Sequence, residues 1–321
     1  MESPQNIKKR LKSVSNIGQI TKAMELVSAT KMRKSQQIAL DSRPYAFAGL
    51  ELLANLTLLE NIKKEELPAL FEVRKNIKKV LFVLVASDKG LAGAFNSSVF
   101  KKFAAHFEKW ASLAPEGREK HLFLAVGQKA HDYLLKKNLD VIKKFVEVGD
   151  FTTTEHAKPL SEFIMKGFLQ KEWDRVVVIS THFKTALKQE PHVRRILPID
   201  FDHIASTIKE IIPERGKFAD LIKENHINFI PNKAKIKEYL IEPSPKKVLE
   251  KLAEHLFFMK IYYLILEANA SEHSARRMAM KTASDNALDL GEKLNLQYNK
   301  SRQQKITTEL TEISAGAEAL Q

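Results

Sequence analysis

Residues 87–93 form the segment of this chain that most resembles a phosphate-binding loop. The apolar run before them predicts a strand and the residues after them predict a helix, and nucleotide phosphates often bind where a strand passes into a helix. However, the glycines at 90 and 93 match neither the Gly-x-Gly-x-x-Gly pattern nor the Gly-x-x-x-x-Gly-Lys-Ser/Thr pattern. The favoured interpretation is therefore a tight structural turn, with a nucleotide site as the alternative.

The other residues whose side chains could take part in catalysis or metal binding do not combine into a site. The ten histidines include no His-Glu-x-x-His motif, and the pairs His121 and His131 or His182 and His192 lack the spacing of metal ligands. The chain has no cysteine, which excludes disulfides and cysteine-based zinc sites. No serine lies in a nucleophile elbow. The sequence therefore predicts a non-catalytic chain without catalytic residues, cofactor or metal.

The composition points to an acidic partner. Lys and Arg number 52 and Asp and Glu number 39, so the net charge is +13 and the pI is near 9.5. Such an excess favours nucleic acid, anionic lipid or an acidic protein surface. The longest apolar run, residues 80–86, is far shorter than the roughly 20 residues that span a bilayer. We therefore expect an intracellular chain that meets a membrane only through other subunits.

The middle of the chain predicts a Rossmann-like α/β domain over residues 75–200. Apolar, β-branched runs alternate there with helical patterns, which is typical of βαβ units and a largely parallel sheet. The expected strands are 79–86, 121–126, 141–148, 175–180 and 193–199, and the expected helices are 96–110, 128–137 and 155–171.

Two long helices are predicted at the ends of the chain. Residues 245–321 contain no proline after the first position, and their tail has apolar residues at steps of four and three, which is typical of a coiled-coil seam. These residues are Ile306, Leu310, Ile313, Ala317 and Leu320. A helix this long needs a partner face. We expect the partner in residues 5–40, where one apolar face is predicted at Ile7, Leu11, Val14, Ile17, Ile20, Met24 and Val27.

The two helices are predicted to form an antiparallel coiled coil. The opposite face of the first helix is basic, with Lys8, Lys9, Arg10, Lys12, Lys22, Lys31, Arg33 and Lys34. Pro44 is expected to interrupt this helix, and residues 50–59 resume the helical pattern. The predicted fold class is thus α/β, with a long antiparallel coiled coil and a Rossmann-like domain. The predicted segments are 1–60, 75–200, 201–244 as a variable insert or linker, and 245–321.

Several motifs resemble the gamma subunit of the bacterial F-type (F1Fo) ATP synthase. The segment 7–33 is similar to the opening of that family, and SDKGLAGAFN at 87–96 is similar to its middle motif. At the end, ASEHSAR at 270–276, ASDN at 283–286, ITTELTEI at 306–313 and GAEAL at 316–320 are similar to the family throughout. The motifs occur in the family's order, which makes the resemblance specific.

The resemblance implies the central-stalk rotor of a proton-translocating ATP synthase. Such a rotor transmits torque between a membrane c-ring and an α3β3 catalytic hexamer, and its implied partners are the alpha, beta, delta and epsilon subunits and the c-ring. No nucleic acid is expected, and the membrane is reached only through Fo. The implied location is the cytoplasmic face of a bacterial inner membrane, as part of F1.

The resemblance also implies roles for individual residues. Arg302 and Gln303 match a family pair that touches an acidic loop of a beta subunit, and Thr307 lies one turn further on. Met24 is expected close to that contact. Basic contacts to the catalytic subunits are implied for Lys8, Lys9 and Arg10, and a coupling role for Arg276.

Two questions stay open in the sequence. Residues 203–237 replace a shorter connection in many relatives, with short helices predicted near 208–212 and 218–222. They are either a surface elaboration, or a regulatory insert or contact to another stator or rotor subunit. The alternative function is a basic, helical nucleic-acid-binding or scaffold protein. No aromatic residue accompanies the basic residues of 1–40, which leaves base stacking unsupported.

Overall fold

The computed structural model describes residues 3–41, 45, 48, 49, 52, 68–74, 76–113, 120–148, 152–199 and 242–318. Within these residues the chain divides into two compact units. The stalk unit comprises residues 1–30, 91–93 and 273–321, and the sheet unit comprises residues 31–90 and 94–272. The predicted insert at 203–237 and the predicted helix at 50–59, except Leu52, lie outside the described residues.

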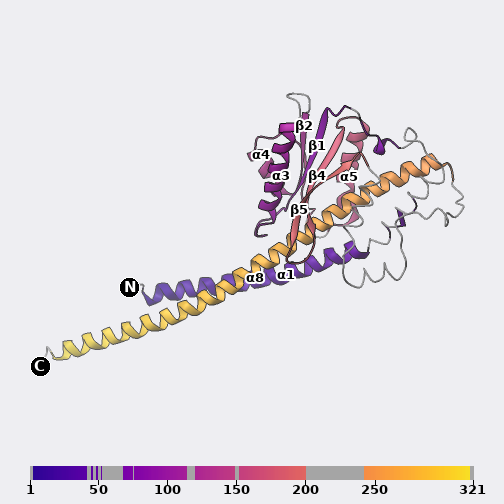
Figure 1. Ribbon diagram of the computed structural model, residues 1–321. Helices are drawn as coiled ribbons and strands as arrows, with labels where there is room; N and C mark the ends of the chain where they lie inside the picture. The colour runs from indigo at the N-terminus through magenta and orange to yellow at the C-terminus, as the bar shows by residue number, and fades with distance from the viewer. Residues whose placement is uncertain are drawn as a thin grey trace. The chain divides into compact units, whose positions relative to one another are not determined.

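The sheet unit is built on five strands, β1 (Lys79–Val85), β2 (Lys120–Val126), β3 (Val141–Phe145), β4 (Arg175–Phe183) and β5 (Gln189–Leu197). Their order is β3-β2-β1-β4-β5, and all neighbours are parallel except β4 and β5 (Figure 1). This confirms the predicted α/β class. Strand β5 begins four residues before the predicted 193, because the polar stretch around Pro191 pairs as an edge strand, where proline is tolerated.

Helices cover both faces of this sheet, which explains why its strands are almost continuously apolar. Helices α3 (Phe95–Leu113) and α4 (Gln128–Lys136) pack on one face, and α5 (Thr154–Leu169) and the first part of α8 (Pro245–Glu318) pack on the other. The core residues on the α3 side include Val80, Phe82, Leu84, Val99, Phe103, Phe123 and Leu134. Those on the α8 side include Leu81, Val83, Leu124, Ile164, Phe168, Phe257 and Ile265.

An ion pair between Arg74 and Asp174 joins the segment before β1 to the start of β4. The guanidinium donates to the Asp174 carboxylate at 2.8 Å and to the carbonyls of Trp173 and Phe168 at 2.7 and 2.6 Å. The second carboxylate oxygen accepts hydrogen bonds from the backbone N–H groups of residues 78 and 79 at 2.8 and 3.0 Å. Since both side chains are nearly buried, this network fixes the starts of the two neighbouring inner strands β1 and β4.

Candidate functional site

The loop after β1 lies at the carboxyl end of the sheet, beside the point where the strand order reverses, as ligand loops do in open α/β sheets. Here the Asp88 carboxylate accepts one hydrogen bond from the backbone N–H of Gln128 at 2.9 Å and another from that of Glu147 at 3.0 Å. The same carboxylate thus holds the start of α4 and the end of β3.

The neighbouring polar groups are also used within the protein. The Asn96 side chain donates to Ser87 Oγ at 2.7 Å and accepts from the Ser87 N–H at 3.1 Å. Gly127 has a φ of +92°, and a Cβ there would lie only 2.0 Å from the Ala86 carbonyl oxygen. These contacts favour the structural-turn interpretation of the loop. Among the described residues, no three His, Cys, Asp or Glu side chains are grouped so that they could hold a metal ion.

The candidate functional surface is the coiled coil of the stalk unit, formed by α1 (Pro4–Asp41) and α8. A Cβ on Gly18 would lie 3.4 Å from the Cβ of Ala287. Four residues later on α1, the Lys22 pKa is raised by its hydrogen bond with Glu25 and, to a smaller extent, by Asp285 on α8. Figure 1 shows the first turns of α1 and the last turns of α8 at the same end of the stalk unit, so the two helices are antiparallel, as predicted.

The seam of this coil differs from the apolar face that the sequence predicted. One row of buried or half-buried positions on α1 follows steps of four and three, and it consists of Ile7, Leu11, Val14, Gly18, Thr21, Glu25 and Ser28. Ile17, Ile20 and Val27, which were predicted to pack inward, are 52, 60 and 54% exposed. The prediction followed the large apolar residues, whereas the helices meet through small and polar ones that permit close approach.

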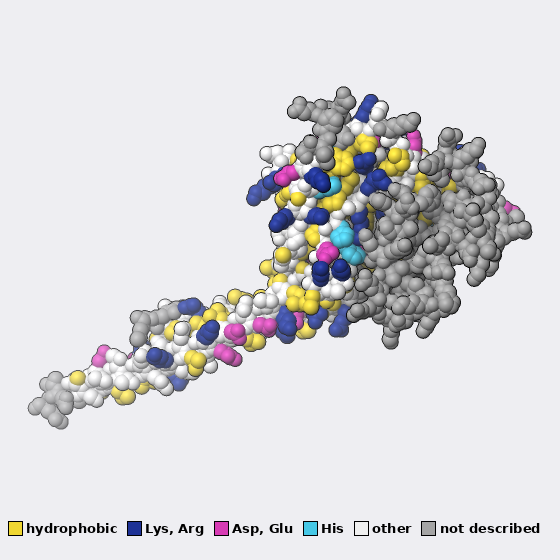
Figure 2. Space-filling model, viewed as in Figure 1, with side chains coloured by type: hydrophobic (Ala, Val, Ile, Leu, Met, Phe, Trp, Pro, Cys, Tyr) yellow, Lys and Arg dark blue, Asp and Glu magenta, His cyan; other side chains and the backbone are white. Residues whose placement is uncertain are grey.

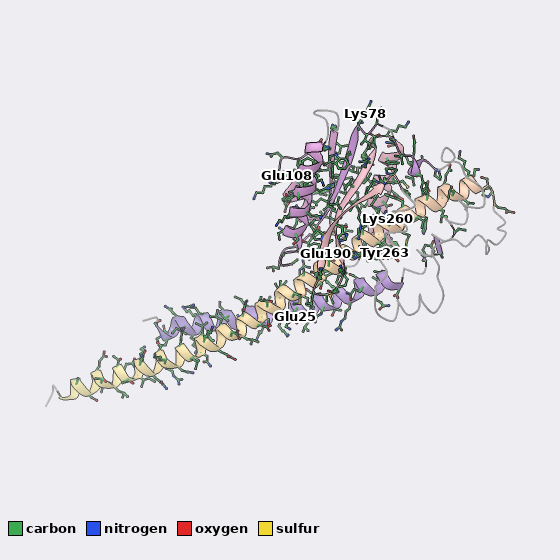
Figure 3. The ribbon with its side chains drawn as sticks, in the orientation of Figure 1. Glu25, Lys78, Glu108, Glu190, Lys260 and Tyr263 are labelled. Atoms are coloured by element: carbon green, nitrogen blue, oxygen red, sulfur yellow. The ribbon has the colours of Figure 1, made fainter. Side chains whose placement is uncertain are left out.

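Glu25, labelled in Figure 3, is the charged residue of this α1 seam, and its carboxylate pairs with Lys22 at 2.8 Å. On α8 the matching buried or half-buried positions are Met280, Ser284, Ala287, Gly291, Leu294, Tyr298 and Ser301. Only the outer part of the seam, near Leu11 and Leu294, combines large apolar residues, so apolar contact is strongest toward the free end of α1.

Beyond Ser301, helix α8 extends past the start of α1 as a single helix (Figure 1). The apolar tail residues Ile306, Leu310 and Ile313 are 48, 60 and 69% exposed, so the prediction that α1 covers them is wrong. The physical reason is length: α1 begins at Pro4, at about the level of Ser301. Along the stalk unit in Figure 2, apolar, basic and acidic side chains alternate over the visible face.

The residues singled out in the sequence fall in different parts of the stalk unit. Lys8, Lys9 and Arg10 are exposed on the first turns of α1, and Met24 is half-buried. Arg302, Gln303 and Thr307 are exposed on the single-helix part of α8. The Thr307 hydroxyl donates to the Gln303 carbonyl at 3.0 Å, which fixes its rotamer along the helix. Arg276 is buried, with a terminal nitrogen 3.3 Å from His273 Nδ1.

Met24 does not lie close to Arg302, contrary to the expectation from the resemblance. Since Gly18 lies opposite Ala287, Met24 lies opposite residues near 281. Arg302 is about 20 residues further along α8, which corresponds to about 30 Å at 1.5 Å per residue. The two residues therefore contact different surfaces, because the antiparallel register separates them.

Sequence reasoning missed a group of polar residues that fasten the first part of α8 to the strands within the sheet unit. The Glu267 carboxylate pairs with Arg194 of β5 at 3.1 Å and with His182 of β4 at 3.2 Å. Burial alone would raise the Glu267 pKa, but the bond with His182 and the charge of Arg194 lower it below its usual value. The available signal was a lone carboxylate that follows the apolar run 261–266.

Two further side chains of α8 hold the loop after β3. The Asn269 amide donates to the Val148 carbonyl at 3.0 Å and to Thr152 Oγ1 at 2.6 Å. The Tyr262 hydroxyl donates to the Thr152 carbonyl at 3.2 Å. Together with Glu267, these bonds attach the first part of α8 to β4, to β5 and to the residues that follow β3, all within the sheet unit.

Comparison with known proteins identifies the family. A family model described as ATP synthase matches residues 3–320. The chain is 35% identical to the ATP synthase gamma chain of Bdellovibrio bacteriovorus, over 100% of this chain and 99% of that relative. It belongs to the ATP synthase gamma-chain family. The gamma chain of Roseiflexus castenholzii is 34% identical, again over 100% and 99% of the two chains.

Solved structures agree on the fold. The chain is similar to one in the mitochondrial ATP synthase of Euglena gracilis, with a TM-score of 0.60, 16% identity and coverage of 99% of this chain and 94% of that one. It is also similar to one in the central stalk and c-ring structure of Tetrahymena thermophila, with a TM-score of 0.54, 22% identity and coverage of 83% and 99%.

Family membership settles the class of function. The chain is a gamma chain, a non-catalytic subunit of an ATP synthase, a complex whose catalytic sites lie on the beta subunits. The comparisons do not support the alternative of a nucleic-acid-binding scaffold. Within the described residues, no helix is both long and apolar enough to span a bilayer.

Proposed function

We propose that this chain turns as a shaft inside an α3β3 hexamer and carries torque between that hexamer and a membrane c-ring. The observation that supports this most is the single helix α8, whose 74 residues correspond to about 110 Å. Its first part is bonded to the sheet unit, its middle is paired with α1, and its end is exposed. One helix therefore has a part fixed by contacts with the strands, a part stiffened by pairing with α1, and an exposed end.

In this proposal, torque passes into α8 through the polar contacts between its first part and the rest of the sheet unit. Bonds from Glu267, Asn269 and Tyr262 are directional, whereas apolar packing alone resists sliding less specifically. The antiparallel pairing with α1 then resists bending and twisting better than one helix alone. Besides the hexamer, the proposed partners of the chain are the c-ring, the epsilon subunit and, within the complex, the delta subunit.

The stalk unit acts on the catalytic subunits through its asymmetry. Each beta subunit meets a different face, and a shaft that contacts nucleotide states unequally shifts their populations. We assign Lys8, Lys9 and Arg10 to contacts with acidic helices of the hexamer. Met24 and Arg276 are assigned to coupling. Arg302, Gln303 and Thr307 are assigned to a contact with an acidic loop of a beta subunit, which we call the catch. The mixed surface of the tip suits a bearing, since a large apolar patch would adhere.

The segments 1–60, 75–200, 201–244 and 245–321 remain our working division of the chain. We place the complex on the cytoplasmic face of a bacterial inner membrane, with this chain peripheral and attached through Fo. The support for a bacterial membrane is the match to bacterial gamma chains over the full length.

The catch gives the direct test of this proposal. Because Arg302 and Gln303 are exposed, their double replacement by alanine is expected to leave the fold and its melting temperature unchanged. An exposed Arg–carboxylate contact contributes about 1 kcal/mol, so coupled ATP synthesis or the yield of assembled complex should fall several-fold. Synthesis is measured in membranes, with complex content quantified in parallel.

The matched control is the pair Lys300→Ala and Gln304→Ala, which lies on the same exposed stretch of α8. The control is expected to retain wild-type synthesis. Wild-type synthesis and yield in the Arg302→Ala, Gln303→Ala variant would remove the proposed catch.

A further inference from the structure

The last part of α8 carries an exposed apolar stripe that no other described part of the stalk unit covers. We call residues 302–318 the tip segment. Ile306, Leu310 and Ile313 are spaced by four and three residues, so they lie on one face of the helix, and about half or more of each is exposed. Helices in proteins gain most of their stability from packing of an apolar face, so a second helix on the stripe would stabilise the tip segment.

The charges beside this stripe change from positive to negative along the helix. Arg302, Lys305, Glu309 and Glu312 follow steps of three, four and three, so they form one row along one side of the stripe. In chain order the row reads positive, positive, negative, negative. The residues on the other side of the stripe, at 303, 307, 311 and 314, are uncharged.

Two such rows are complementary in charge when the two helices run antiparallel. If two tip segments lie antiparallel with Ile306 of one against Leu310 of the other, the basic half of each row meets the acidic half of its partner. In a parallel pair the charged row of each helix would instead face the uncharged side of its partner, so these charge pairs would not form. The exposed pair between Lys305 and Glu309 at 3.5 Å within one helix is weak, so both groups remain able to form contacts between chains.

We propose that two copies of this chain, when outside the complex, pair through their tip segments as a short antiparallel coiled coil. The occupant of the stripe is thus a second copy of the same chain. Pairing and insertion into a hexamer use the same surface, so they exclude each other. This last point rests on the proposed function, whereas self-pairing does not.

The test is sedimentation equilibrium of the purified full chain at low salt over a range of concentrations. We expect a reversible monomer–dimer equilibrium that weakens as salt rises, because exposed charges are screened. Changing Glu309→Lys and Glu312→Lys makes the row uniformly positive and should abolish the dimer. Changing Arg302→Glu and Lys305→Glu makes it uniformly negative and should do the same. Mixing these two variants should restore a dimer that contains one copy of each.

The control changes Asp289→Lys and Glu292→Lys, which alter the net charge equally on the exposed side of the paired part of α8, and it should dimerise as the wild type does. A chain that ends at Ser301 should be monomeric. A monomeric wild type at every concentration, a dimer that survives removal of the tip segment, or charge variants that do not pair on mixing would each overturn the proposal. None of these outcomes bears on ATP synthesis, so a failure here is distinct from a failure of the rotor function.

Discussion

Replacing Met24 by lysine is expected to lower ATP synthesis about tenfold while ATP hydrolysis survives. Met24 is half-buried between the exposed residues Ile20 and Val27, so a lysine there reaches solvent without opening the seam. If the new ammonium pairs with a carboxylate of a catalytic subunit in one rotor position, that position becomes harder to leave. A contact of 1.4 kcal/mol made in only one state corresponds to about a tenfold change in rate.

The deciding measurement is the ratio of synthesis to hydrolysis in membranes that contain equal amounts of assembled complex. Met24→Gln is the matched control, since it is polar and of similar length but uncharged, and it should keep the wild-type ratio. An unchanged ratio in Met24→Lys would refute the coupling role. Loss of assembled complex in both variants would show that Met24 serves packing instead.

Replacing Asp174 by asparagine is expected to destabilise the sheet unit by about 3 kcal/mol, because it leaves the nearly buried Arg74 guanidinium without its counter-charge. For a unit of this size, that free energy corresponds to a fall of about 10 °C in melting temperature. Thermal unfolding followed by circular dichroism measures it. The control is Asp132→Asn. Its half-exposed carboxylate accepts an exposed hydrogen bond from the Gln128 side chain at 2.7 Å and lies 4.0 and 3.9 Å from Lys129 and His131, so the melting temperature should change little.

The same carboxylate makes stability depend on pH. Burial alone would raise the Asp174 pKa, but the Lys78 N–H, the Arg74 guanidinium and the Lys79 N–H together lower it below its usual value of 3.8. Because the folded pKa is below the unfolded one, the stabilisation is complete above pH 3.8 and is lost as pH falls through the folded pKa. The difference in stability between the wild type and Asp174→Asn should therefore shrink in acid. A difference that stays constant down to pH 2 would contradict this assignment.

The sheet unit was predictable because its strands are buried on both faces, so runs such as residues 80–86 carry an unmistakable apolar signal. The start of β5 was not, because an edge strand with Pro191 is polar and depends on its partner β4 rather than on its own sequence. The ion pairs of Glu267 could not be predicted from the sequence, for a similar reason. They join residues 73 and 85 positions apart, and no local pattern specifies such a contact.

In the stalk unit, the spacing of apolar residues did not predict which face of α1 is buried. Two rows on α1, one beginning at Ile17 and one at Gly18, share the same three- and four-residue spacing, and the more apolar row was chosen. The structure buries the row with Gly18 and Ser28, because close approach of two helices favours small residues over large ones. The exposed row is then free for contact with other subunits. Helix existence was therefore predictable from the sequence, but the orientation of its faces depended on the partner helix.

Direct observation of rotation tests the central claim most directly. The chain has no cysteine, so Leu187→Cys, at a position that is 78% exposed between β4 and β5, introduces a unique attachment point for a bead. The complex is reconstituted from this chain and the alpha and beta subunits of the same source, and the hexamer is fixed to a surface. We predict that ATP drives continuous rotation of the bead in one direction. A bead that stays in place while the same complex hydrolyses ATP would contradict the rotor function.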